Sequence, residues 1–249
     1  RYDLDQITYA KQPPWKVDYS PHSNGVNRRE MYEGFWKNAT SEDWKLMTMR
    51  YYANITWIDD MLGRTMNELA IKGLLDNALI VYTADHGEML GEHYYRFNKY
   101  CLYDASVKVP LILAGSALPA STQPGSVDRR PVDLVDVLPT VLAAAGIKGD
   151  ANLPGYSLLE TPQRKGSFSA LHERKGEAAF MWRTETDKLI LVFDRKEKAS
   201  DYTVADIKAG EFYQLDKDPL EWNDLYDKPA VQERRKTYTQ AILGQLAAM

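Results

Sequence analysis

The sequence contains almost no cysteine and no long apolar run. Cys101 is the single cysteine among 249 residues, so a disulfide within the chain is excluded. No stretch approaches the roughly 20 consecutive apolar residues that a membrane-spanning helix needs. We therefore expect neither a disulfide framework nor a membrane span.

The sequence also lacks an excess of basic residues. Lys and Arg number 31 against 35 Asp and Glu, which gives a formal net charge of −4. A nucleic-acid partner would require a clustered basic face, so none is expected. With 44% hydrophobic residues the chain can bury a core, and its length fits one large domain or two small ones.

Apolar residues in the first half predict one long helix and two strands. Between residues 41 and 72 they recur every three or four positions, which predicts a helix, and Thr40 with Asp43 forms a capping-box-like start. The continuous apolar runs 78–84 and 109–114 predict strands that are buried on both faces. This order is typical of an α/β domain.

Two further segments complete this half. Residues 136–145 predict a helix with Asp136 as its N-cap and Gly146 at its end. Residues 1–40 carry three prolines and show little periodicity, so they predict an irregular arm. We expect this arm to lie on other protein.

The second half has a different character. From about residue 150, short apolar segments alternate with charged or Gly-containing turns, which predicts a small antiparallel sheet, and a helix over 229–247 should cover one face. The predicted strands are 167–171, 178–183, 189–193 and 211–215. We therefore expect an α/β core with the irregular arm over residues 1–150 and a small α+β subdomain over residues 151–249.

Asp85 and His86 are the first candidate site residues. They follow the apolar run 78–84 and precede Gly87, so they stand at the carboxyl end of a strand, where α/β sheets bind ligands. Carboxylate oxygen and imidazole nitrogen both bind metals, and the pair alone suits Mn²⁺, Zn²⁺ or Fe²⁺ better than Ca²⁺. The alternative is a capped turn in which Asp85 accepts loop N–H groups and His86 hydrogen-bonds a neighbour.

A longer motif surrounds this pair. The run Thr83-Ala84-Asp85-His86-Gly87-Glu88 is followed by Gly91-Glu92-His93, by Lys99 and by Val109-Pro110-Leu111, and Asp218-Pro219-Leu220-Glu221 comes near the end. This order and spacing resemble the sulfatases of the alkaline phosphatase superfamily from about residue 41 onward. The Asp-His form is similar to the iduronate-sulfatase, choline-sulfatase and phosphonate-monoesterase branches. The resemblance implies a partial alkaline-phosphatase-like core of sheet and helices.

The resemblance also implies a role for three residues. Asp85 and His86 would coordinate a divalent metal ion, which in this family is usually Ca²⁺, with Mn²⁺ or Zn²⁺ as alternatives. Lys99 would bind a sulfate oxygen beside the nucleophile, where an ammonium stabilises developing charge. The alternative for Lys99 is a solvated loop lysine. The interval from Asp85 to Lys99 is one residue longer than in the closest branches, and we place the insertion within residues 94–98.

Three other residues are weaker candidates for substrate binding. His93 could help to shape the pocket, or it could be a histidine in a surface turn. His22 follows a proline, as a substrate-contacting histidine of the family does, but no apolar strand precedes it. Arg183 stands before Thr184 in a pattern that commonly has a structural role in the family.

The nucleophile motif of the family is absent. Sulfatases convert the first residue of a Cys/Ser-x-Pro/Ala-x-Arg motif to formylglycine, and neither Cys101 nor Ser121 begins such a motif. We therefore predict the C-terminal part of a longer sulfuric ester hydrolase, inactive alone and completed by its own N-terminal half. Its substrate would be a sulfated small molecule or carbohydrate, and the family suggests a periplasmic or secreted protein.

The sequence is compatible with one further partner, a second copy of the chain, and with two other functions. Exposed strand edges would favour a homo-oligomer. The same superfamily contains phosphonate and phosphate ester hydrolases, for which an unmodified Ser or Thr nucleophile would argue. A non-catalytic binding protein that retains the fold is the third possibility.

Overall fold

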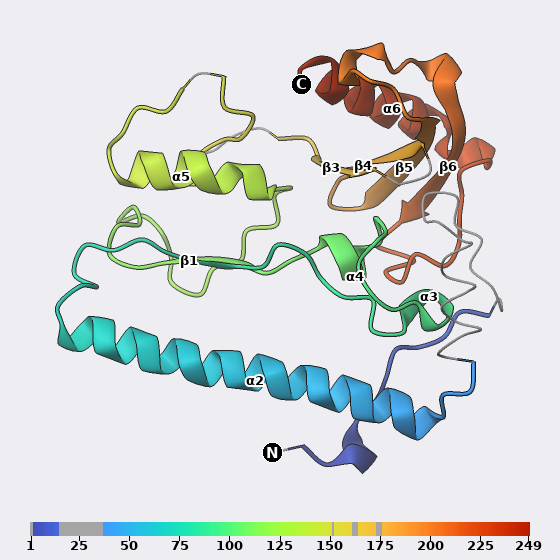
Figure 1. Cartoon of the computed structure of the whole chain (residues 1–249). Coiled ribbons are helices and arrows are strands. Elements are labelled where there is room, and N and C mark those ends of the chain that lie inside the picture. Colours follow the sequence, from blue (N-terminus) through green and yellow to red (C-terminus); the bar gives the residue numbers. More distant parts are fainter. Residues whose placement is uncertain (1, 15–36, 151, 161–163, 173–175) are drawn as a thin grey trace.

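Helix α2 is the longest element of the chain. The computed structural model describes residues 2–14, 37–150, 152–160, 164–172 and 176–249 (Figure 1), and α2 spans Ser41–Ile71. The predicted capping box is confirmed, because Asp43 N donates to Thr40 Oγ1 at 3.2 Å and Thr40 N donates to Asp43 Oδ2 at 2.8 Å. Gly73 follows with a φ of 65°, which glycine adopts without strain. None of the described helices is long and apolar enough to cross a membrane.

The start of the chain lies along α2. Tyr2 Oη is 2.5 Å from Thr56 Oγ1, and Ile7 is buried. Residues 2–14 therefore contact this chain, and the expectation that the arm lies on other protein stays a prediction. The rest of the arm, residues 15–36, is outside the described residues.

Strands β1, Ile80–Thr83, and β2, Leu111–Ala114, form an antiparallel pair. In Figure 1 this pair runs between α2 and α5. The prediction that both strands are buried on both faces is wrong for this chain, since Thr83 is exposed and Ile112 is 55% exposed. Among the described residues, neither strand pairs with a third one.

Helix α5, Val137–Ala144, follows a 3₁₀ turn over Leu134–Asp136, and the chain then leaves the helix at Gly146. The prediction that Asp136 is the N-cap residue of α5 is confirmed, but its side chain accepts no hydrogen bond from the first turn of the helix. Its carboxylate instead binds the N–H groups of Asp133 and Tyr156, each at 2.9 Å, and the guanidinium of Arg164 at 2.5 Å. The Asp136 carboxylate is therefore bound by Arg164 and by two backbone N–H groups that lie outside α5.

The second half forms the predicted antiparallel sheet. Its strand order is β3-β4-β5-β6, and helix α6, Gln232–Ala247, covers one face (Figure 1). The strands are Ser167–His172, Glu177–Arg183, Asp187–Asp194 and Ile207–Gln214. Further 3₁₀ turns occupy Leu4–Gln6, Ala199–Asp201, Val204–Asp206 and Pro229–Val231.

Strand β5 is buried on both faces. Leu191 and Phe193 belong to the core beneath α6, whereas Ile190 and Val192 belong to a second core on the opposite face. Alternating side chains of one strand thus serve two layers. The second core consists of Met89, Cys101, Leu102, Tyr103, Ala179, Met181, Ile190, Val192, Tyr213 and Leu215. The loop between β1 and β2 therefore rests directly on the C-terminal sheet, and this loop contains the short helices α3, Glu92–Tyr95, and α4, Asp104–Val107.

Candidate functional site

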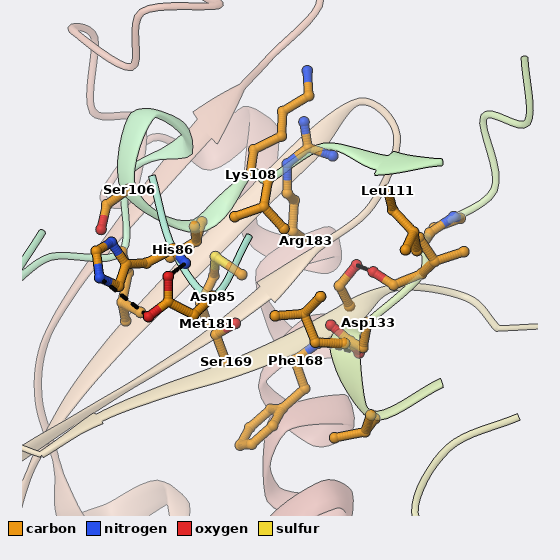
Figure 2. Close-up of a pocket in the computed structure, with 18 of the residues that line it drawn as sticks. Asp85, His86, Ser106, Lys108, Leu111, Asp133, Phe168, Ser169, Met181 and Arg183 are labelled. Atoms are coloured by element: carbon orange, nitrogen blue, oxygen red, sulfur yellow. Dashed lines mark hydrogen bonds and ion pairs between the residues drawn. The ribbon is translucent and has the colours of Figure 1, made fainter. Parts of the chain in front are cut away.

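The Asp85–His86 turn begins two residues after β1. Asp85 Oδ1 accepts the backbone N–H of His86 at 3.0 Å, and His86 Nδ1 is 2.8 Å from the carbonyl oxygen of Gly87. A carbonyl oxygen can only accept, so Nδ1 is the donor in this contact and the lone pair of a neutral imidazole lies on Nε2. This Nε2 is 3.5 Å from Asp85 Oδ2 (Figure 2). A backbone carbonyl orients metal-binding histidines in the same way.

The two side chains fit part of a metal site. The Asp85 side chain is 87% exposed, and its Oδ2 and His86 Nε2 face one another at a separation that an ion could bridge. Within the described ranges, no group of three or more His, Cys, Asp or Glu side chains is arranged to hold a metal. Among the described residues, this turn therefore brings together two side chains of the kind that bind metals.

Gly87 connects this turn to helix α4. Its N–H donates to the carbonyl oxygen of Ser106 at 2.7 Å. A Cβ at this position would lie 2.0 Å from the carbonyl oxygen of Ala105, so a larger residue cannot fit without movement of the backbone. The glycine therefore permits the close approach of the Asp85–His86 turn and the segment that follows Lys99.

Lys99 lines the same hollow as Asp85 and His86, which has a volume of about 700 Å³. Its carbonyl oxygen accepts hydrogen bonds from Cys101 N at 2.8 Å and from Ser106 Oγ at 2.6 Å. The structure thus brings together the three residues to which the sequence assigned the main roles.

Sequence reasoning missed other basic residues around this hollow. Lys108 lines it together with Arg183 (Figure 2), and Arg129 and Arg130 line it as well. Arg130 forms an ion pair with Asp128 at 2.5 Å. The signal for Lys108 was its position immediately before the Val109-Pro110 strand start, at the end of the motif that carries Lys99.

A buried charge cluster surrounds Asp104, which follows Lys99 in the loop between β1 and β2. Lys188 Nζ is 2.5 Å from Asp104 Oδ1 and 2.5 Å from Glu221 Oε1. Arg183 binds Asp104 with two parallel contacts, Nε to Oδ1 at 2.9 Å and Nη2 to Oδ2 at 2.7 Å. The cluster joins the end of the loop between β1 and β2 to β4, to β5 and to the turn that contains Glu221.

Burial and ion pairing act in opposite directions within this cluster. Burial disfavours the charged form of Asp104, but Lys188 and Arg183 outweigh it and hold the pKa of Asp104 well below its usual range. Burial raises the pKa of Glu221. Burial, together with the nearby charges of Glu221 and Asp104, also raises the pKa of Glu92.

The three weaker candidates occupy different places. His93 is 1% exposed and stacks on Tyr103, with 3.6 Å between ring centroids, and it is not among the residues that line the hollow. It is therefore not a surface-turn histidine. Arg183 lines the hollow, but its guanidinium is bound to Asp104. His22 lies outside the described residues.

The segment in which we predict the insertion has an unusual backbone. Tyr94, Tyr95 and Asn98 have φ values of 59°, 61° and 80°, in the left-handed region that residues with a Cβ seldom adopt. Gln12 holds the segment, because its Nε2 donates to Gly91 O at 3.0 Å and its Oε1 accepts from Tyr95 N at 3.2 Å. The start of the chain thus supports the loop between the Asp85–His86 turn and Lys99.

Comparison with known proteins gives two family matches. The family described as Sulfatase matches residues 18–147, and the family described as N-sulphoglucosamine sulphohydrolase, C-terminal, matches residues 91–247. The first match covers the Asp85–His86 turn and Lys99. The second covers Lys99, the buried charge cluster and the C-terminal sheet.

Curated relatives agree with these matches. The chain is 37% identical to arylsulfatase K of Bos taurus over 182 residues, which are 69% of this chain and 32% of that protein. It is 30% identical to the N-acetylglucosamine-6-O-sulfatase of Bacteroides thetaiotaomicron over 249 residues, which are 94% of this chain and 42% of that protein. The chain thus spans less than half the length of both relatives.

Solved structures share the fold. The phosphonate monoester hydrolase of Agrobacterium radiobacter has a TM-score of 0.71 and 25% identity, over 84% of this chain and 43% of that one. A protein solved in complex with its substrate, D-glucosamine-2-N,6-O-disulfate, has a TM-score of 0.65 and 27% identity, over 89% of this chain and 45% of that one. The family matches and these likenesses establish that the chain belongs to the sulfatase family.

Proposed function

We propose that this chain supplies one part of the active site of a longer sulfatase that hydrolyses sulfuric esters. The observation that carries the proposal is that Asp85, His86 and Lys99 line one hollow. A non-catalytic protein that retained only the fold would have no need for a carboxylate, an oriented imidazole and an ammonium at one place. Family membership supports the same conclusion.

Asp85 and His86 hold a divalent metal ion in this proposal. Ca²⁺ is the ion that the family resemblance implies, and Mn²⁺ or Zn²⁺ would also suit a carboxylate and an imidazole. A bound divalent ion would polarise an oxygen of the ester. The contact from His86 Nδ1 to the Gly87 carbonyl keeps Nε2 available as a ligand.

Lys99 holds an oxygen of the sulfate group. Its ammonium stabilises negative charge that develops on the transferred group, in a hollow where other side chains displace water. The nucleophile, a formylglycine in this family, would come from a part of the protein outside this sequence. We therefore expect the chain alone to be inactive, and the N-terminal half of the same protein to complete the site.

A sulfated carbohydrate is the proposed substrate. Two relatives support this class: one is a sulfatase named for N-acetylglucosamine-6-O-sulfate, and the other was solved with a glucosamine disulfate. Lys108 and Arg129, which line the same hollow, add positive charge to it. N-acetylglucosamine 6-sulfate is therefore the first substrate to assay.

Phosphonate ester hydrolysis is the second candidate. The likeness to phosphonate monoester hydrolase, with a TM-score of 0.71, favours it. The nucleophile discriminates between the two reactions, since a formylglycine motif argues for sulfatase and an unmodified Ser or Thr for phosphoryl transfer. Parallel assays of a sulfate monoester and a phosphonate monoester with the complete protein would decide between them.

Substitution of Asp85 and Lys99 by Ala in the complete protein tests the proposal. We expect each variant to lower kcat by about 10²–10³-fold, because removal of one electrostatic stabiliser commonly costs that much. Asp216→Ala and Lys217→Ala are matched controls, since both residues are exposed in the turn after β6. Unchanged turnover in Asp85→Ala and Lys99→Ala would refute the assignment.

A further inference from the structure

Lys188 is a buried ammonium for which the proposed chemistry has no use. Its side chain is 0% exposed, and Nζ contacts Asp104 Oδ1 and Glu221 Oε1 at 2.5 Å each and donates to the Leu102 carbonyl oxygen at 3.1 Å. Burial of charges is costly, and well-packed apolar residues often stabilise a core equally well. The cluster therefore calls for an explanation other than stability.

Apart from the ion pair between Lys188 and Glu221, the contacts of this cluster converge on residues 102–104. Lys188 holds the carbonyl of Leu102 and the carboxylate of Asp104. Glu221 Oε2 accepts the backbone N–H of Asp104 at 2.6 Å. Arg183 holds the same carboxylate through two contacts. Side chains from β4, β5 and the 218–225 turn thus hold both backbone and side chain of one short segment.

A closed turn links this segment to Lys99. The Lys99 carbonyl oxygen accepts from Cys101 N and Ser106 Oγ, and Ser106 N donates to the Tyr103 carbonyl oxygen at 2.9 Å. Cys101, Leu102 and Tyr103 are each no more than 3% exposed. A displacement of residues 102–104 would therefore move the backbone of Lys99 as well.

We infer that Lys188, with Asp104 and Glu221, positions Lys99 in the hollow. Lys188 and Glu221 are positioning residues, because they act through the backbone of the 99–106 turn and not on the substrate. Directional contacts of charged groups hold a loop in one geometry, whereas apolar packing tolerates small shifts. This inference rests on the proposed role of Lys99.

A double-mutant cycle in the complete protein tests the inference. The variants are Lys188→Met, Lys99→Met and their combination, with kcat and KM measured on a sulfate ester. We expect Lys188→Met to lower kcat at least 10-fold with a smaller change in KM. In the Lys99→Met background, Lys188→Met should cause no further loss, since residues that act through one another are not additive.

A second variant and a control keep the test independent of folding. Lys188→Met leaves two buried carboxylates without their shared cation, so Glu221→Gln, which preserves shape and an acceptor, is taken through the same cycle. Lys208→Met is the control, because Lys208 also binds two carboxylates, Glu177 at 3.1 Å and Asp194 at 2.9 Å, but on the exposed surface. Thermal unfolding shows which variants are folded, and the control should retain kcat.

The outcomes separate this inference from the proposed function. If Lys99→Met loses activity but the losses are additive, Lys188 does not act through Lys99 and the inference is wrong while the proposed function stands. If folded Lys188→Met and Glu221→Gln variants retain wild-type kcat, the inference is also wrong. If Lys99→Met itself retains activity, the role of Lys99 in the proposed function is wrong, and the inference falls with it.

Discussion

His86 shows how a backbone contact decides the chemistry of a side chain. The sequence predicts a carboxylate and an imidazole after a strand, but it cannot tell which ring nitrogen is free. In the folded chain Nδ1 contacts the Gly87 carbonyl, and Nε2 faces Asp85. Which ring nitrogen is free depends on the backbone conformation of the turn. The hydrogen bond from Gly87 to Ser106 helps to fix that conformation.

Metal removal is the first prediction at the scale of residues. We expect a chelator to abolish turnover by the complete protein and added Ca²⁺ to restore it. The reason is that Asp85 and His86 without a bound ion cannot polarise an oxygen of the ester. Direct measurement of bound metal should find one tight ion in the complete protein and weaker binding in His86→Ala. Full activity after verified metal removal would contradict the ligand assignment.

Acid stability is the second prediction at this scale. The pKa of Asp104 is depressed in the folded state, so its ionised form stabilises the fold. This contribution is fully present above the ordinary Asp pKa and is lost as pH falls through the lower folded pKa. The groups that face Asp104 are Lys188, Arg183, Glu221 and Glu92.

Comparison with Asp104→Asn isolates this contribution. We expect the difference in unfolding free energy between wild type and Asp104→Asn, measured in urea, to be largest near neutral pH and to shrink as pH falls below about 4. The exposed Asp216→Asn variant serves as the control and should show no such trend. A difference that is constant from pH 7 to pH 2 would contradict the role of the Asp104 charge.

At the scale of elements, the local sequence pattern predicts the helices and strands. It does not predict the shape of the loop between β1 and β2. Helix α2, the four-stranded sheet and α6 match their predictions, because apolar periodicity reports which face of an element is buried. The loop between β1 and β2 has no such period. Its shape depends on distant residues, including Gln12, Lys188 and Glu221.

Gly87→Ala tests the contact between two parts of this loop. The new Cβ would meet the Ala105 carbonyl oxygen, so we expect a loss of about 1–3 kcal/mol in unfolding free energy, typical of overpacking. Gly63→Ala is the matched control, since Gly63 lies within α2 with no atom within 4 Å of a new Cβ, and it should stabilise by about 0.5–1 kcal/mol. Urea unfolding of the chain measures both, and equal stability of Gly87→Ala and wild type would argue against the close approach.

At the scale of the whole molecule, this chain exposes apolar side chains along α2. Tyr51, Ile55, Ile58 and Leu62 form an apolar stripe on α2 and are 36–47% exposed. The pair β1–β2 has no third strand among the described residues. Large apolar patches and open strand edges are sites of association. The N-terminal half of the protein is the partner that we propose for them, and a second copy is the alternative when that half is missing.

Self-association of the isolated chain is the prediction at this scale. We expect sedimentation velocity to show oligomers whose fraction rises with concentration, and the double variant Ile55→Lys/Ile58→Lys to shift the chain toward monomer. Val204→Lys is the control, because Val204 is 54% exposed but lies outside α2. A chain that stays monomeric at all concentrations would show that the apolar stripe on α2 and the open strand edges do not mediate self-association.

The sequence by itself determined the α/β character, the antiparallel C-terminal sheet and the three main candidate residues. These features rest on short-range periodicity and on motifs whose residues are close in the chain. Only the tertiary structure decided that His93 is buried in the core and that Arg183 is bound to Asp104, 79 positions away. It also placed Glu221 on the backbone of Asp104 across 117 positions. Such contacts depend on how the loop and the sheet pack together, and no local pattern in the sequence records that packing.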